Sequence, residues 1–265
     1  MTFEELHRII KNTIHKVDEF QMKESNTRNI ILMGRARTGK STVAQTLEDT
    51  SYVPNRTLSL YSETKEIEFH PVATPTPRNG PLFNFNIIDT PGFYDQTEKI
   101  GQRLTNEYTT HLIDECMKKD MTNIHCFAFV FNLHNGINNE DIESMLHVQK
   151  TYASVKKHMI LLLTHSEETT KEVRDTLLTN FFKHEVVANN NLKDFFGAGV
   201  FYMGCFRSQL RDNPDPTAAT VQLKNILEMR KMLLEFLIKK TTFYNIHRDP
   251  TEQNSGQPSS ICRTS

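Results

Sequence analysis

The residues best suited to chemistry lie together at positions 34–41, where the sequence reads Gly-Arg-Ala-Arg-Thr-Gly-Lys-Ser. This segment matches the pattern G-x-x-x-x-G-K-S/T at every fixed position, and in that pattern backbone N–H groups surround phosphate oxygens. Lys40 would then reach the β- and γ-phosphates of a nucleoside triphosphate, and the Ser41 hydroxyl would coordinate Mg²⁺. The expected phosphate-binding residues are Gly34, Arg35, Ala36, Arg37, Thr38, Gly39, Lys40, Ser41 and Thr42.

A second candidate group is Asp-Thr-Pro-Gly at residues 89–92, directly after the apolar segment 82–88. A strand that ends in an aspartate presents a carboxylate to Mg²⁺ in P-loop proteins, which is the role we expect of Asp89. Gly92 has no Cβ, so its backbone N–H can move toward a γ-phosphate. Alone, these four residues would indicate an ordinary turn. Their place about fifty residues after the glycine-rich loop favours a GTPase over a kinase or ATPase.

The third candidate group, which would select the base, follows the apolar segment 159–163. GTPases carry N/T-K-x-D at this place, where the carboxylate accepts hydrogen bonds from guanine and the lysine covers the purine. Here Thr164 keeps the first position, His165 replaces the lysine and Glu167 replaces the aspartate. An imidazole can stack on a purine, and a glutamate can accept the same two hydrogens. Glu168 remains an alternative to Glu167, and a polar loop that caps the next helix remains the structural alternative.

Together these segments resemble the GTPase branch that contains septins, chloroplast-import receptors and the immunity-associated (IMAP, AIG-type) nucleotide-binding proteins, most of all the last group. The resemblance covers about residues 28 to 240. The matching segments are residues 34–41, 62–65, 89–93 and 164–165, with the hydrophobic residues 127–133 leading into 138–141. The chain departs from the family in its basic loop interior, 35–38, and in its incomplete base-selecting motif.

The resemblance implies roles for residues that the motifs alone do not define. Thr64 matches the switch I threonine that meets Mg²⁺ and the γ-phosphate, with Thr57 as an alternative. The implied metal ligands are Ser41, Thr64 and Asp89, and the implied catalytic residues are Lys40, Thr64 and Gly92. Phe93 stands where other GTPases carry the glutamine that orients the attacking water. A phenyl ring cannot do this, so we expect slow hydrolysis.

The function implied is therefore a guanine-nucleotide switch that binds GTP or GDP with Mg²⁺ and forms homo-oligomers in the GTP state. The alternative is a nucleotide-gated scaffold with negligible GTPase activity. Arg35 and Arg37 would either be solvated or reach across an interface that faces the nucleotide.

The elements that must position these groups alternate between strand and helix. This order predicts an α/β fold of three layers, the P-loop NTPase fold, with a mostly parallel central sheet flanked by helices. Strands are expected at residues 29–33, 82–88, 159–163 and 200–203, and helices at 97–119, 138–157, 168–183 and 217–240. Gly204 and Cys205 follow the last strand, where this fold contacts the base or ribose.

Outside the central domain, 25–240, two segments have their own character. Residues 1–24 predict an amphipathic helix, because Phe3, Leu6, Ile10, Val17 and Phe20 form a helical stripe. We expect this helix to pack on the domain, with partner binding as the alternative. Residues 241–265 are polar and predict a disordered tail.

Composition excludes several other functions. The 265 residues carry a net charge of −1, which does not support nucleic-acid binding. No apolar run approaches the roughly 18 residues of a membrane span, and membrane association through a partner or a modification stays possible but unsupported. Four scattered cysteines and the absence of a signal peptide favour a cytoplasmic protein, with peripheral association with an intracellular membrane left open.

Overall fold

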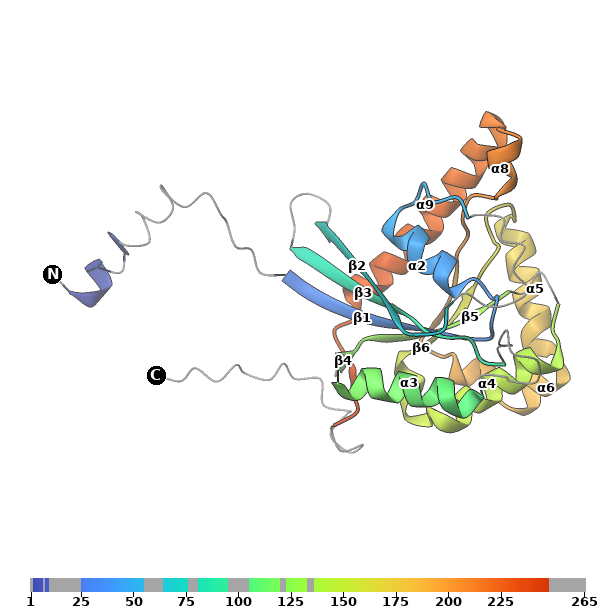
Figure 1. The fold of residues 1–265 in the computed structure, drawn as a ribbon, viewed down its shortest axis with the longest axis horizontal. Coiled ribbons are helices and arrows are strands. Elements are labelled where there is room, and N and C mark those ends of the chain that lie inside the picture. The colour runs from blue at the N-terminus through green and yellow to red at the C-terminus, as the bar shows by residue number, and fades with distance from the viewer. Residues whose placement is uncertain are drawn as a thin grey trace.

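The computed structural model describes residues 2–6, 8–9, 25–54, 64–75, 81–94, 105–119, 123–132 and 136–247. Their centre is a six-stranded sheet in the order β2-β3-β1-β5-β6-β7, shown in Figure 1. The strands are β1 (Ser25–Met33), β2 (Glu68–Pro75), β3 (Leu82–Asp89), β5 (Cys126–Phe131), β6 (Met159–Leu163) and β7 (Gly199–Tyr202). All neighbouring pairs are parallel except β2 with β3. The expected mostly parallel sheet is confirmed.

Helices cover both faces of this sheet and complete three layers (Figure 1). One face packs against α2 (Lys40–Glu48) and α9 (Pro216–Lys239), which contribute Val43, Leu47, Met229 and Leu233 to its core. The opposite face packs against α3 (Asn106–Lys119), α4 (Asn139–Thr151), α5 (Lys171–Lys183), α6 (Glu185–Asn189) and α7 (Leu192–Phe195). The shorter elements are η2 (Ala153–His158), α8 (Gln209–Asp212), and β4 (Asn123–Ile124) paired with β8 (Tyr244–Asn245).

The central strands are stable because their apolar side chains pack into the cores on both faces of the sheet. In β1, Ile31 and Met33 enter one core while Ile30 and Leu32 enter the other, which is the two-residue period of a strand. Strands β5 and β6 are buried along their whole length, as expected for parallel strands covered on both faces. Because parallel strands end at the same edge, the segments after β1, β3 and β6 meet there.

The expected helices shift in detail for local reasons. The predicted helix 138–157 is divided at Tyr152 into α4 and η2. Helix α4 begins after Asn138, whose side chain accepts a hydrogen bond from the Asp141 N–H at 2.9 Å. Helix α5 starts at 171 rather than 168 because Thr170 caps it.

Two expectations about the chain ends need correction. Phe3 is 79% exposed and Ile9 is 52% exposed, so the described part of the N-terminal segment does not pack on the domain. The polar tail begins later than residue 241, because β8 pairs with β4 and Tyr244 packs edge-on against Phe127. Most of residues 1–24, residues 248–265 and Thr57 lie outside the described residues.

Candidate functional site

The glycine-rich loop connects β1 to α2, as its pattern predicts. Gly34 has a φ of 144°, and a Cβ there would lie 2.4 Å from the carbonyl oxygen of Val130. Gly39 has a φ of 93°. Both positions therefore require glycine. The Nζ of Lys40 donates to the carbonyl oxygens of Gly34 at 3.3 Å and Arg35 at 3.0 Å, which holds the ammonium group inside the loop.

The three expected metal ligands meet at one end of this loop. The Ser41 Oγ donates to Asp89 Oδ2 at 2.6 Å and lies 2.9 Å from the Oγ1 of Thr64. Thr64 Oγ1 is 3.5 Å from the same carboxylate oxygen. Hydroxyl and carboxylate oxygens are the ligands that Mg²⁺ prefers. The structure therefore brings Thr64 into the group with the two residues that motifs alone identified.

Asp89 shows directly that this group suits a cation. It is fully buried, and its Oδ1 accepts no hydrogen bond from the residues that the structure describes. Burial raises the pKa of this carboxyl, while the nearby charge of Lys40 opposes that effect. A buried carboxylate oxygen without a donor is unfavourable unless a cation or a hydrogen compensates it. The donor set and the unpaired oxygen both fit Mg²⁺.

Gly92 and Phe93 lie directly against the glycine-rich loop at residues 34–41, which is called the phosphate loop from here on. The Ala36 N–H donates to the Phe93 carbonyl oxygen at 3.1 Å, and the Phe93 N–H donates to the Gly34 carbonyl oxygen at 3.0 Å. A Cβ on Gly92 would lie 2.4 Å from the nitrogen of Ala36. The ring of Phe93 is buried in the core, 5.5 Å from the His147 ring, and cannot face a water near the loop.

A cavity of about 320 Å³ opens beside Gly39 and Thr42, where the loop leads into α2. It is lined by the loop at residues 164–167 (the base-selecting loop), by α2 and by the segment after β7. Its size suits a small organic ligand. Seven expected nucleotide-binding residues line it: Gly39, Thr42, Thr164, His165, Glu167, Gly204 and Cys205. The structure thus joins three segments that are far apart in the sequence.

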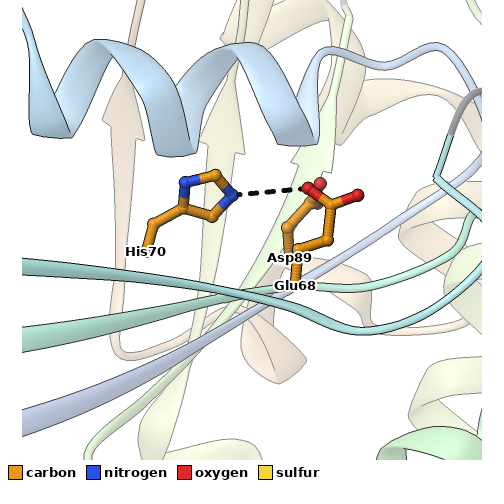
Figure 2. Close-up of side chains that lie close together, drawn as sticks. All are labelled: Glu68, His70 and Asp89. Carbon is orange, nitrogen blue, oxygen red and sulfur yellow. Dashed lines mark ion pairs between the residues drawn. The ribbon is translucent and has the colours of Figure 1, made fainter.

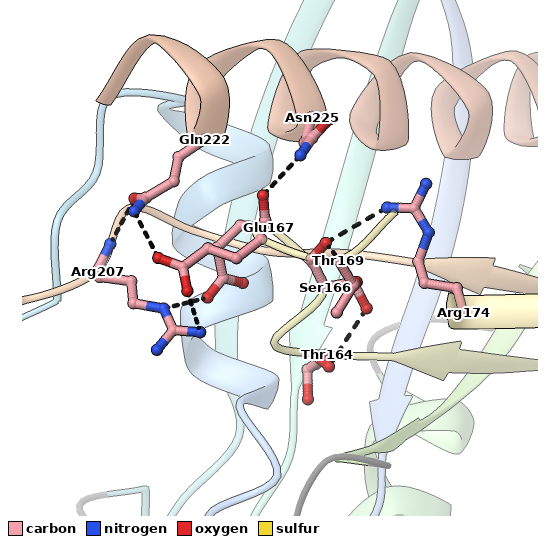
Figure 3. Close-up of polar contacts among 9 residues, drawn as sticks. Thr164, Ser166, Glu167, Thr169, Arg174, Arg207, Gln222 and Asn225 are labelled. Carbon is pink, nitrogen blue, oxygen red and sulfur yellow. Dashed lines mark hydrogen bonds and ion pairs between the residues drawn. The ribbon is translucent and has the colours of Figure 1, made fainter. Parts of the chain in front are cut away.

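Glu167, labelled in Figure 3, and its neighbour Glu168 have different environments. The Glu167 side chain is 2% exposed, and its Oε1 accepts from the Arg207 Nε at 3.1 Å. Its Oε2 accepts no hydrogen bond from the described part of the chain. Glu168 is 45% exposed, does not line the cavity, and binds Arg207 and the Gln222 amide. The geometry favours Glu167 as the residue that faces a base.

Gly204 is needed beside this carboxylate. A Cβ at Gly204 would lie 2.6 Å from the Glu167 Oε2 and 2.8 Å from the Glu167 nitrogen. Its neighbour Cys205 has a thiol whose pKa burial raises to about 12, so this side chain stays neutral beside Glu167. At Gly204 and Cys205 the segment after β7 therefore contributes close packing and no charge.

Arg35 and Arg37 have different environments. Arg35 forms ion pairs with Glu140 and with Asp141, the latter at 3.6 Å, so within the chain it is paired rather than simply solvated. Arg37, with a φ of 65°, is exposed. Arg207 was not among the expected site residues, because no local pattern marks it. Only the fold brings its guanidinium onto Glu167.

The fold and the site define a P-loop GTPase of the α/β class. A model of the AIG1 family matches residues 28–198, and the chain belongs to this family of GTP-binding proteins. The resemblance that the motifs indicated is therefore confirmed.

Two solved structures are similar to this chain, and the second of them shares its fold. A dimerization-deficient mutant of Toc33 from Arabidopsis thaliana is 18% identical over 85% of this chain and 91% of its own, with a TM-score of 0.44. A structure of the chloroplast translocon components atToc33 and psToc159, described as showing that dimerization is important for GTPase activity, is 16% identical. It covers 92% of this chain and 93% of its own, with a TM-score of 0.52. No curated protein gives a significant sequence match.

Among the described residues, no helix has both the length and the apolar character to cross a membrane.

Proposed function

We propose that this protein binds GTP and GDP with Mg²⁺, hydrolyses GTP slowly, and acts as a nucleotide-controlled switch. The observation that carries the proposal is the convergence of Ser41, Thr64 and Asp89 beside the ammonium group of Lys40. The cavity is lined by Gly39 and Thr42, on either side of Lys40 and Ser41, so one ligand would reach both the cavity and this group. Mg²⁺ bound here would neutralise charge on the β- and γ-phosphates.

At the phosphate end, the chain supplies charge and backbone donors. Lys40 is held by the carbonyl oxygens of Gly34 and Arg35, so a phosphate needs only to replace these weak acceptors. The N-terminus of α2 adds the partial positive charge of its backbone N–H groups. Thr64 comes from outside the loop, and its position would report whether a γ-phosphate is present.

At the base end, the unpaired Oε2 of Glu167 supports recognition of guanine. Guanine offers N–H donors on its N1 and N2 atoms, and these would satisfy a buried carboxylate. Adenine presents an acceptor at N1 and would leave the carboxylate unsatisfied. Arg207 holds the other oxygen and so orients the group, while His165 and Thr164 line the same cavity.

The position of Phe93 supports slow turnover. Its buried ring cannot orient water, and the carbonyl and N–H groups of its backbone hydrogen-bond the loop. A GTPase without an arginine finger turns over on the order of 10⁻³ per second or below, and we expect this chain to be no faster. The same burial favours the second candidate, a nucleotide-gated scaffold with negligible GTPase activity.

We include homo-oligomer formation in the GTP state as part of the proposal. In atToc33 and psToc159, dimerization is described as important for GTPase activity. A second protomer that supplied the missing catalytic group would have the same effect here.

The decisive experiment measures GTP turnover at increasing protein concentration, after chromatography has identified the nucleotide retained by the purified protein. Retained guanine nucleotide and a specific activity that rises with concentration support the switch that assembles. A flat, measurable activity supports a self-sufficient enzyme, and zero activity with tight GTP binding supports the scaffold. Absence of any nucleotide binding overturns the proposal.

A further inference from the structure

Three side chains gather on one face of the β2–β3 pair, and two of them, Glu68 and His70, lie outside the set assigned above. Glu68 lies directly opposite Asp89 in the antiparallel register, and His70 follows Glu68 by two residues. Residues two apart on a strand share a face. One donor atom from each of the three residues lies within 4.8 Å of the other two (Figure 2).

The two carboxylates make this arrangement unfavourable by itself. Like charges directly opposite each other on neighbouring strands destabilise the pair. Asp89 is fully buried, and its Oδ1 has no hydrogen-bond partner in the described part of the chain. Mutual repulsion and an unsatisfied oxygen both call for a positive charge at this point.

The orientation of His70 suits metal coordination. Its Nδ1 lies 3.4 Å from the Oε2 of Glu48, at the end of α2. Its Nε2 points toward the two carboxylates in Figure 2, lies 3.8 Å from Glu68 Oε2, and makes no hydrogen bond with any described residue. A histidine that binds a metal through one nitrogen commonly donates from the other to a carboxylate. Glu48 occupies that supporting position.

We propose that Glu68, His70 and Asp89 bind a second divalent cation, one that accepts an imidazole ligand, such as Zn²⁺ or Co²⁺. One nitrogen and two carboxylate oxygens suit these ions, whereas Mg²⁺ and Ca²⁺ favour oxygen ligands alone. The three ligands come from the chain alone, so the site does not depend on the proposed GTPase function. It shares Asp89 with the magnesium group, so occupation here would weaken the binding of Mg²⁺ with nucleotide.

The test is a titration of the full chain, stripped of nucleotide and metal, with CoCl₂ followed by visible absorbance and with ZnCl₂ followed by calorimetry. We expect one ion per chain. His70→Ala and Glu68→Ala should each weaken binding by at least tenfold, and Glu48→Gln should weaken it by about tenfold. His111→Ala is the matched control, because this exposed histidine on α3 lies outside the cluster. Circular dichroism checks that each variant is folded.

Three results would overturn the inference. They are no binding of Co²⁺ or Zn²⁺ by the wild type at millimolar concentration, equal affinities in wild type and the Glu68→Ala variant, or displacement of Co²⁺ by equimolar Mg²⁺. A separate GTP titration with Mg²⁺ keeps the two proposals apart. Normal GTP binding without Co²⁺ binding rejects only the second cation site. Co²⁺ binding without GTP binding rejects only the proposed function.

Discussion

The hydroxyl of Thr164 donates a hydrogen bond to the carbonyl oxygen of Thr38 at 2.7 Å, although the two residues are 126 positions apart. This bond joins the base-selecting loop to the phosphate loop at a buried point. A nucleotide that spans both loops would therefore meet two surfaces whose spacing is already set. Preorganisation of this kind reduces the free energy lost on binding.

Thr164→Val should weaken GTP and GDP by the same factor. The substitution keeps the shape but leaves the Thr38 carbonyl without this donor, which costs about 1 kcal/mol, or roughly fivefold in affinity. Titration with fluorescent analogues of both nucleotides checks this. A selective loss of GTP alone would show that Thr164 acts on the γ-phosphate instead.

Lys40→Ala should lower triphosphate affinity by at least tenfold, about 1.4 kcal/mol, because it removes the ammonium group held inside the loop. Ser41→Asn should weaken GTP more than GDP, since the Ser41 hydroxyl touches Asp89 in the proposed magnesium site. Both are measured by fluorescent nucleotide titration with and without Mg²⁺. Lys40→Ala protein that binds GTP as tightly as wild type would remove the phosphate-loop assignment.

Glu167→Ala should reduce the preference for GTP over ATP. Losing the buried carboxylate leaves the guanine N–H groups without an acceptor, at a cost of about 1–3 kcal/mol, while ATP binding changes little. Glu168→Ala is the matched control, because Glu168 is half-exposed and does not line the cavity. Competition titration measures the ratio of GTP affinity to ATP affinity in each variant. A larger effect in the control than in Glu167→Ala would reverse the assignment.

Thr64→Ala should abolish nucleotide-dependent assembly. The wild type is expected to form dimers or larger oligomers with a non-hydrolysable GTP analogue and to be monomeric with GDP. Without its hydroxyl, residue 64 no longer contacts Ser41, so the γ-phosphate is not sensed. Light scattering at tens of micromolar protein distinguishes the states. The same monomeric mass in both nucleotides would leave assembly without support.

Acid should destabilise the protein through a buried histidine pair. Burial lowers the pKa of His125 and of His158 to about 4, and the His125 Nδ1 accepts an N–H from Asn29 at 3.1 Å. Unfolding returns each pKa to about 6.5, so the unfolded chain binds more protons between pH 6.5 and 4. The contribution of each neutral histidine to the free energy of unfolding is therefore fully present above pH 6.5. It falls as the pH drops toward 4, by about 3 kcal/mol for one histidine.

Urea unfolding of wild type and His158→Gln between pH 7 and 4.5 measures this effect. The variant should lose less stability on acidification, and the comparison cancels the contributions of Asp89 and the other carboxyls. His111→Ala serves as the exposed control. If the free energy of unfolding falls equally with pH in wild type and His158→Gln, the buried histidine does not cause the acid sensitivity.

The sequence predicted the parts of the site that depend on local patterns. The phosphate loop, Asp89 and the segment from Thr164 to Glu167 are each a short motif after an apolar strand, and parallel strands bring such motifs to one edge. Residues joined only by folding were not predictable. The ion pair of Arg207 with Glu167 spans 40 residues, and the pairing of Glu68 with Asp89 depends on the register of an antiparallel edge strand.

The choice between Glu167 and Glu168 could not be made from the sequence for a related reason. The carboxylates of Glu167 and Glu168 are equally able to accept hydrogen bonds, and the two side chains differ only in burial. That difference comes from Gly204, which lets the chain approach Glu167 closely. The burial of Phe93 likewise depends on the helices that cover it.

The ion pairs of Arg35 connect the phosphate loop to the first turn of α4, on the face of the sheet opposite α2. In mechanical terms this is a tether between the loop and a helix whose residues do not line the cavity. Any shift of the loop when phosphate enters must either pull that turn along or break the ion pairs. The surface around α4 would then sense the state of a site on the far side of the sheet.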